Sequence, residues 1–226
     1  YFLGKFALEE GRGAGEFYTP ESIVKLIVEI IEPYKGRIYD PACGTGGMFV
    51  QSANFIIRHK KEALGQLSIF GQEKELSTVR LNKINLAVHG LAGDIRQGIS
   101  YYDDEHNSIN KFDYVMANPP FNVEGVKKEK IKNDKRYIFG VPKVDNANYL
   151  WIQIFLSALN KNGRAGFVMA ASATDAGKSE EAIRQKLIET GDVEAIGTIS
   201  NNFFYTRSLP CHLWFFNKNK QDKDSV

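Results

Sequence analysis

The segment from Ala117 to Phe121 (ANPPF) places an amide, two prolines and an aromatic ring directly after the apolar run FDYVM. An exocyclic amino group on a nucleic-acid base is a poor nucleophile, because its lone pair is delocalised into the ring. The Asn118 side-chain carbonyl and the Pro119 main-chain carbonyl could accept its two N–H hydrogens and aim the lone pair at an electrophile. Two rigid prolines would fix these acceptors, and an aromatic ring would stack on a base flipped out of a duplex. The candidate catalytic residues are therefore Asn118, Pro119, Pro120 and Phe121.

A glycine-rich turn, DPACGTGG, lies earlier in the chain between a strand candidate and a helix candidate. It matches neither GxGxxG nor GxxxxGK[ST], and it has no lysine, so the phosphates of NAD or ATP have no evident cradle. A plain tight turn would explain it if it stood alone. The turn residues expected to face a ligand are Asp40, Pro41, Cys43, Gly44, Thr45, Gly46 and Gly47.

Two acidic residues favour a ligand at this turn. Glu73 and Asp94 are expected to end the second and third strands, and parallel strands present their carboxyl ends at one edge of a sheet. A carboxylate on the second strand can accept both hydroxyls of a ribose, and one on the third can accept from an adenine amino group. A ligand with ribose and adenine but without phosphate describes S-adenosylmethionine.

Helix and strand signals alternate along the chain, which indicates a parallel sheet covered by helices on both faces. Thr19 is expected to cap a helix that starts at Pro20, and an amphipathic helix is expected to end at Gly163. Further helices are predicted over residues 46–63, 76–90 and 179–191. Strands are predicted over residues 37–40, 67–73, 91–94, 112–117, 164–171, 193–199 and 209–217, and residues 99–111 are expected to form a mobile connection.

The 226 residues, 43% apolar and 25% charged, predict a single domain over residues 1–226. Two distant cysteines without a CxxC pair favour a reduced, cytoplasmic setting, and the four histidines show no ligand spacing, so no metal is expected. No apolar run approaches the roughly 20 residues of a membrane helix. The chain begins abruptly at Tyr1, which favours a fragment of a longer polypeptide, with residues 1–19 as its lead-in.

The net charge is only +2, but basic residues gather in one predicted loop, residues 123–145. The segment KKEKIKNDKR carries six basic and two acidic residues. It could contact DNA phosphates regardless of base sequence, although a solvated loop explains it equally well. The candidate contacts are Lys127, Lys128, Lys130, Lys132, Lys135 and Arg136.

Taken together, these motifs resemble the S-adenosylmethionine-dependent DNA adenine-N6 methyltransferases, most closely the modification (M) subunit of type I restriction-modification systems. The resemblance covers essentially the whole chain and includes GEFYTP, GQE, ANYLWIQIFL, NGRAGFV and LPCHLWFF. It implies a Rossmann-like α/β fold with a seven-stranded, mostly parallel sheet, one antiparallel strand and helices on both faces. It also implies duplex DNA with a flipped adenine as substrate, and a specificity (S) subunit and a restriction (R) subunit as partners.

The resemblance assigns roles residue by residue. Thr45 to Gly47 would contact the methionine part of the cofactor, Glu73 its ribose, and Asp94 with Ile95 its adenine. Asn118 to Phe121 would hold the target adenine. The methionine part would also contact the segment before the first helix: Glu16, Phe17, Tyr18, Thr19, Pro20 and Glu21.

Three alternatives use the same features differently. A methyltransferase acting on a protein glutamine or on guanine in RNA would need the same amide-proline chemistry, and the EFYTP segment and the long match weigh against it. A non-catalytic nucleotide-binding module would not need Asn118. A nicotinamide dehydrogenase would need pyrophosphate contacts, which the glycine turn lacks.

Overall fold

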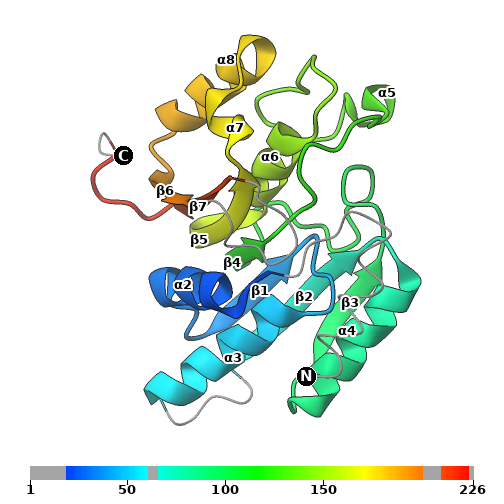
Figure 1. Ribbon diagram of the computed structural model, residues 1–226, viewed down its shortest axis with the longest axis vertical. Helices are drawn as coiled ribbons and strands as arrows, with labels where there is room; N and C mark the ends of the chain where they lie inside the picture. Colours follow the sequence, from blue (N-terminus) through cyan, green and yellow to red (C-terminus); the bar gives the residue numbers. More distant parts are fainter. Residues whose placement is uncertain (1–18, 61–65, 201–209, 224–226) are drawn as a thin grey trace.

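A computed structural model describes residues 19–60, 66–200 and 210–223 (Figure 1). Its core is one seven-stranded sheet with the strand order β3-β2-β1-β4-β5-β7-β6. The first five strands pair in parallel, and β7 is antiparallel to both of its neighbours. The predicted sheet is therefore confirmed. The strands are β1 (Gly36–Asp40), β2 (Leu67–Glu73), β3 (Gly93–Gln97), β4 (Phe112–Ala117), β5 (Leu159–Ala170), β6 (Val193–Ile199) and β7 (Cys211–Asn217).

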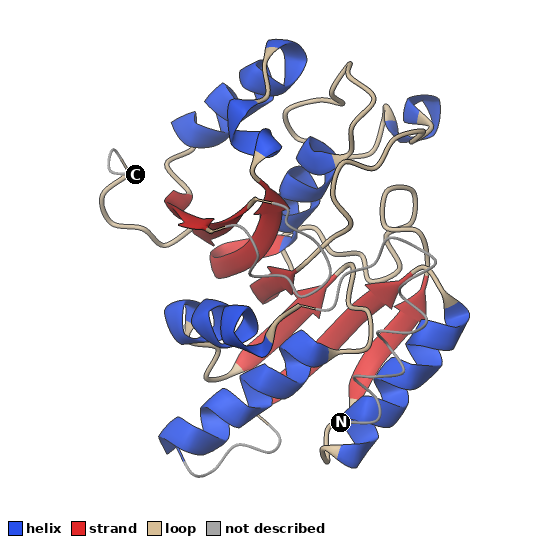
Figure 2. Ribbon diagram, viewed as in Figure 1, coloured by secondary structure: helices blue, strands red, loops and turns tan. Residues whose placement is uncertain are grey.

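Helices cover both faces of this sheet (Figure 2). Successive residues of β4 illustrate the two cores, since Val115 belongs to the buried cluster that contains Leu150 and Ile183, and Met116 belongs to the buried cluster that contains Ile27 and Phe49. This alternation follows from the two-residue period of a strand. The helices are α2 (Glu21–Ile31), α3 (Gly47–Lys60), α4 (Leu76–Val88), α5 (Lys128–Ile131), α6 (Asn148–Ala158), α7 (Ser172–Asp175) and α8 (Lys178–Glu189).

The third strand begins later than expected. Gly90 has φ of +68°, and the amides of Gly90 and Leu91 donate to the carbonyls of Ala87 and Leu86. These bonds satisfy the last carbonyls of α4, as a glycine in the left-handed region commonly does at a helix end. The third strand is therefore present, but its predicted bounds, residues 91–94, are wrong: the first two of these residues follow the helix terminus, and β3 runs from Gly93 to Gln97.

Helix α6 also differs from its prediction. All of its residues are buried, so it is not amphipathic, and it ends at Ala158 because β5 already starts at Leu159. Its outer side is covered by the connection after β3 and by the basic loop, through Tyr101, Ile131 and Tyr137. The sequence does not reveal this second cover, because the covering residues are distant in the chain.

The connection at residues 99–111 is extensively hydrogen-bonded, contrary to the expectation of a mobile loop. The Gln72 side chain donates to the Asp103 carbonyl at 3.0 Å and accepts from the Glu105 amide at 3.3 Å. His106, in the same connection, has a buried side chain whose Nε2 lies 2.9 Å from the Gly71 carbonyl oxygen. The middle of the loop, residues 103–106, is thus fixed to β2. None of the helices in the described ranges is long and apolar enough to cross a membrane.

Candidate active site

The glycine turn and the NPPF segment meet where the order of the strands reverses. Strand β1 pairs with β2 on one side and β4 on the other, so chain connections leave it in opposite directions. Ligands of open α/β sheets bind outside the carboxyl ends of the strands at such a point. Asp40 is the last residue of β1, residues 41–46 connect it to α3, and residues 118–121 follow β4, so these two turns are neighbours on one edge of the sheet (Figure 1).

The glycine turn leaves open space above its backbone. Gly44 and Gly46 have φ of +48° and +86°, the left-handed region that favours glycine. A Cβ added at Gly46 would come within 2.9 Å of the Asn82 side chain, whereas at Gly44 or Gly47 it would meet no atom within 4 Å. The turn therefore presents bare backbone on one side and is tightly packed against α4 on the other.

Two asparagines of α4 hold this turn in place. Asn82 donates from Nδ2 to the Gly44 carbonyl at 2.8 Å, and Asn85 donates from Nδ2 to the Thr45 carbonyl at 2.8 Å. The Asn82 amide also lies 3.3 Å from Cys43 Sγ. Neither residue was predicted from the sequence. The sequence does place two asparagines three positions apart in a predicted helix. Side chains at that spacing lie on the same face of a helix.

Glu73 lies beside the glycine turn, as expected, at the end of β2. Its Oε2 accepts from the Gly44 amide at 3.1 Å, and its Oε1 accepts from the Glu75 amide at 3.1 Å. Burial raises the pKa of Glu73, with the two backbone hydrogen bonds opposing the rise. The nearby Asp40 is buried as well, and burial raises its pKa although its carboxylate accepts from the Ala42 amide.

Asp94 does not reach this edge, so the prediction that it ends the third strand is wrong. In the parallel register Phe70 pairs with Asp94 and Glu73 pairs with Gln97. Asp94 therefore lies three positions, about 10 Å, short of the edge. Its Oδ2 pairs with Arg96 at 2.6 Å, and this hydrogen bond lowers its pKa. Ile95 is 2% exposed and packs in the core.

The residues of β3 that do reach the edge follow Asp94 and were missed. Gln97 is the last residue of the strand, and the Gly98 amide donates to the Glu73 carbonyl at 3.0 Å. Ile99 then exposes 38% of its surface. A signal for this turn is present in the sequence: Gly98, in RQGIS, lies three residues after the predicted adenine contacts Asp94 and Ile95.

Asn118 occupies the first position after β4. Its Nδ2 donates to Thr19 Oγ1 at 2.9 Å, and its Oδ1 is buried without a hydrogen-bond partner in the described parts of the chain. An unsatisfied buried acceptor costs about 1–3 kcal/mol, which a ligand with an N–H group would offset. Phe121 is half-buried and packs beside the core on the α2–α4 side of the sheet.

The end of the NPPF segment is anchored by α6. Asn122 has φ of +52°, its amide donates to Asn148 Oδ1 at 3.0 Å, and its own Oδ1 accepts from Asn148 Nδ2 at 2.8 Å. Asn148 is the buried first residue of α6. This reciprocal pair closes the turn after Phe121, and it was not predicted from the sequence.

A family model described as N-6 DNA Methylase matches residues 1–226. The chain belongs to this family. It is 45% identical, over 98% of its length, to the type I restriction enzyme MjaIX methylase subunit of Methanocaldococcus jannaschii, of which it covers 40%. It is 37% identical, over 100% of its length, to the type I restriction enzyme HindI methylase subunit of Haemophilus influenzae, of which it covers 51%. The family resemblance stated from the motifs is confirmed.

Solved structures agree on the fold. A modification subunit of a putative type I restriction enzyme from Vibrio vulnificus is 26% identical with a TM-score of 0.74, over 95% of this chain and 48% of that one. A type I restriction-modification methyltransferase subunit from Streptococcus thermophilus is 24% identical with a TM-score of 0.83, over 93% of this chain and 46% of that one. The chain thus spans about half the length of these relatives, or less.

Of the segment expected to contact the methionine part of the cofactor, Glu16, Phe17 and Tyr18 lie outside the described residues. Thr19 contacts Asn118 and does not cap α2 with its side chain, so its predicted capping role is wrong. The Pro20 carbonyl accepts from the amides of Ile23 and Val24. Glu21 pairs with Lys25 at 2.8 Å on the helix surface, and their hydrogen bond lowers its pKa.

The basic loop divides into exposed lysines and one buried arginine. Arg136 is 1% exposed; it pairs with Asp134 at 2.6 Å and donates to the carbonyls of Ser100 and Asp103 at 2.9 and 3.2 Å. Because these acceptors enclose its guanidinium, Arg136 holds the loop in place and cannot reach a DNA phosphate. The prediction that it contacts phosphate is therefore wrong. Lys128 is half-buried, and its Nζ donates to the Lys143 and Val144 carbonyls. The exposed members are Lys127, Lys130, Lys132 and Lys135.

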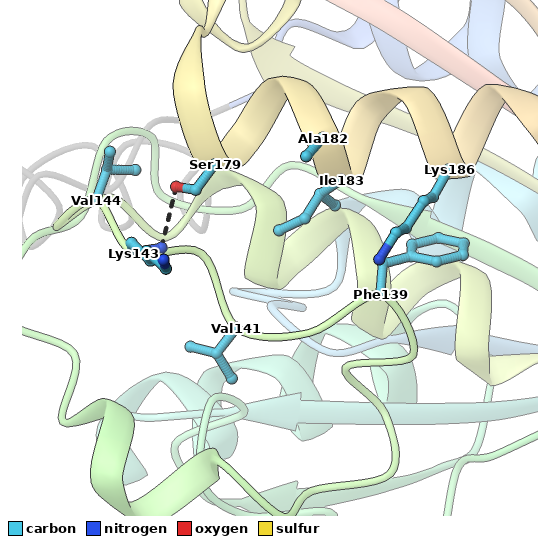
Figure 3. Close-up of a pocket in the computed structure, with 8 residues that line it drawn as sticks. All are labelled: Phe139, Val141, Lys143, Val144, Ser179, Ala182, Ile183 and Lys186. Atoms are coloured by element: carbon cyan, nitrogen blue, oxygen red, sulfur yellow. Dashed lines mark hydrogen bonds between the residues drawn. The ribbon is translucent and has the colours of Figure 1, made fainter.

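A separate cavity of about 520 Å³ lies between this loop and α8 (Figure 3). Phe139 and Val141 contribute its wall on the loop side, and the Lys143 amide donates to Ser179 Oγ across it at 3.1 Å. None of the predicted catalytic or cofactor residues lines it. The cavity is therefore not a part of the site at the sheet edge.

Proposed function

We propose that this chain is the catalytic part of a DNA methyltransferase that transfers a methyl group from S-adenosylmethionine to the N6 amino group of adenine. One observation carries the proposal. The Asn118 side-chain carbonyl is buried without a partner in the described chain, immediately after β4 and next to the open glycine turn. An acceptor in that state is suited to bind an amino group.

The family and its members support DNA as the substrate. The matching model is an N-6 DNA methylase, and the relatives are methylase subunits of type I restriction enzymes. These names favour adenine in DNA over a protein glutamine or guanine in RNA. By the same reasoning, the proposed partners are duplex DNA with a flipped adenine, a specificity subunit and a restriction subunit, and the proposed location is the cytoplasm.

The residues at the edge fit S-adenosylmethionine. The open backbone side of Gly44 to Gly47 would lie against the methionine part, and the Glu73 carboxylate, which already accepts one amide on each oxygen, has further lone pairs for the two ribose hydroxyls. Gly98 and Ile99 replace Asp94 and Ile95 as the residues proposed beside the adenine. When bound, this cofactor supplies an electrophilic methyl group on a positively charged sulfur.

The chain's own contribution is to orient the target amino group. Asn118 Oδ1 and the Pro119 carbonyl would each accept one N–H hydrogen, which favours a tetrahedral nitrogen with its lone pair directed at the neighbouring glycine turn. The same two acceptors stabilise the positive charge that develops on the nitrogen. Phe121 would stack on the base, and the exposed lysines of the basic loop would contact phosphates.

Replacing Asn118 tests this role. In the intact protein with its specificity partner, Asn118→Ala is expected to bind S-adenosylmethionine normally by calorimetry and to lose methyl transfer to duplex DNA by roughly 10²-fold or more. Asn162→Ala is the matched control. Asn162 is exposed and lies near the start of β5, away from the carboxyl edge of the sheet, so this variant should behave as wild type. Undiminished transfer by Asn118→Ala would remove the assigned role, and transfer to ribosomal RNA or to release factor instead of DNA would favour the other substrates.

A further inference from the structure

The Asn118 amide is bound by a residue 99 positions earlier in the chain. Its Nδ2 donates to Thr19 Oγ1 at 2.9 Å, while its Oδ1 stays without a partner in the described residues. We propose that Thr19 is a positioning residue, which orients the Asn118 amide so that its carbonyl faces the target amino group. This inference rests on the proposed function and deepens it.

The need for such a residue follows from the symmetry of an amide. The last torsion of an asparagine side chain is broad and roughly two-fold, so NH₂ and C=O can exchange places at little cost. If the Asn118 NH₂ group faced the adenine amino group, two hydrogen-bond donors would face each other and no bond would hold the base. In this structure the Thr19 hydroxyl accepts from the NH₂ group, which leaves the carbonyl as the group available to the base.

Thr19 is available for this task because α2 does not use its side chain. No side-chain cap is present at the start of α2, and its first main-chain bonds run from the amides of Ile23 and Val24 to the Pro20 carbonyl, at 3.0 and 3.2 Å. Ile23, Val24 and Pro20 are all buried. Thr19 therefore precedes a buried, packed helix start, and the ring of Pro20 restricts the backbone conformation of Thr19.

The assignment differs from a cofactor contact in a measurable way. A residue that bound the methionine part would act on affinity for S-adenosylmethionine. A residue that orients Asn118 acts on the rate of transfer after both substrates are bound, since it sets the geometry of the amino group.

The test compares Thr19→Val, which keeps the shape but removes the hydroxyl, with Thr19→Ser, which keeps the hydroxyl. In the intact protein with its specificity partner, Thr19→Val is expected to lower kcat by roughly 10- to 100-fold, because it removes one hydrogen bond and misplaces the amide. Its Kd for S-adenosylmethionine and its KM for DNA should stay within about twofold, and Thr19→Ser should restore kcat to within about threefold of wild type. Thr198→Val, an exposed threonine on the edge strand β6, is the control.

Each other outcome counts against the proposal. Unchanged kcat in Thr19→Val would overturn it, and weaker cofactor binding with normal kcat at saturation would make Thr19 a cofactor contact instead. Loss of both properties would show a role in folding or binding and not in orientation. Full activity of Asn118→Ala would overturn the proposed function itself, whatever Thr19 does, so the two failures can be told apart.

Discussion

The ends of β2 and β3 look alike in sequence and differ in structure. Each carries an acidic residue after an apolar run, yet Glu73 is the last residue of its strand and Asp94 is the second residue of its own. Glu73 is buried and bonded to the glycine turn, whereas Asp94 is paired with Arg96 below the edge. A carboxylate serves a ligand at the sheet edge only if the strand ends there, and the strand's length decides that.

The two ends are also held in different ways. The β2 end is fixed by its own residue, because both Glu73 oxygens accept main-chain amides. The β3 end is fixed from outside, since the connection that follows it is bonded to Gln72 of β2 and to Arg136 of the basic loop. The adenine side of the proposed cofactor site therefore depends on a segment that lies after NPPF in the chain.

Arg136→Met should have the largest effect. It removes the guanidinium that satisfies the Ser100 and Asp103 carbonyls and leaves Asp134 without its cation, and breaking a buried pair typically costs about 3–5 kcal/mol. We expect the free energy of unfolding, measured in urea, to fall by about 3 kcal/mol.

The exposed Lys135→Met is the matched control and should change stability by less than about 0.5 kcal/mol. Lys127→Met should likewise leave stability unchanged. If Lys127 contacts a phosphate, the Lys127→Met variant should show a salt dependence of DNA binding that is smaller by about one charge. Equal stability of Arg136→Met and Lys135→Met would mean that the β3 end does not depend on the basic loop.

The second prediction separates the two carboxylates directly. A hydrogen bond to a charged group contributes about 1.5–3 kcal/mol, and 1.4 kcal/mol is a factor of ten in affinity. Glu73→Gln is therefore expected to weaken S-adenosylmethionine binding by about 30-fold in calorimetry, and Asp94→Asn by less than about threefold. An equal loss in both variants, or a larger loss in Asp94→Asn, would contradict the register argument.

The pH dependence of binding sharpens the same comparison. Burial raises the pKa of Glu73, so its charge, and the cofactor affinity that depends on it, should be lost on acidification at a higher pH than for an exposed glutamate. The pKa of Asp94 is lowered by Arg96, so Asp94 stays ionised over this range. The Glu73→Gln variant should lack the acid-dependent loss of affinity, and Asp94→Asn should retain it.

The site shows which features sequence reasoning can reach. The glycine turn, Glu73 and NPPF were placed correctly at one edge because each lies at a strand end marked by a turn signal in its own neighbourhood. Asp94 was misplaced because Gly90 and Leu91 terminate α4 and delay the strand, which an apolar run cannot indicate. The Thr19–Asn118 and Asn122–Asn148 contacts join distant segments, and no local pattern encodes them. Burial of Arg136 follows from its partners at residues 100–103, not from its own basic neighbours.

The smallest expected effect concerns the interaction of Asp94 with the buried His106. Its Oδ2 lies 3.7 Å from Nδ1 of the buried His106, whose Nε2 donates to the Gly71 carbonyl. The charges of Arg96 and Lys111 also act on this ring. Burial lowers the pKa of His106, while Asp94 and the Gly71 carbonyl oppose the shift. Asp94 thus reduces the cost of protonating a buried imidazole.

The sign of the effect follows from proton binding. Below about pH 6.5 the unfolded histidine takes up a proton that the folded one resists, so the free energy of unfolding falls as the pH drops from there toward the lowered pKa of the folded state. Urea unfolding from pH 7.5 to 5 should show this loss in the wild type, and His106→Gln, which keeps a donor for Gly71, should flatten it. Asp94→Asn lowers the folded pKa of His106 further and should therefore extend the loss to lower pH. An acid profile unaffected by Asp94→Asn would leave Asp94 no role at this histidine.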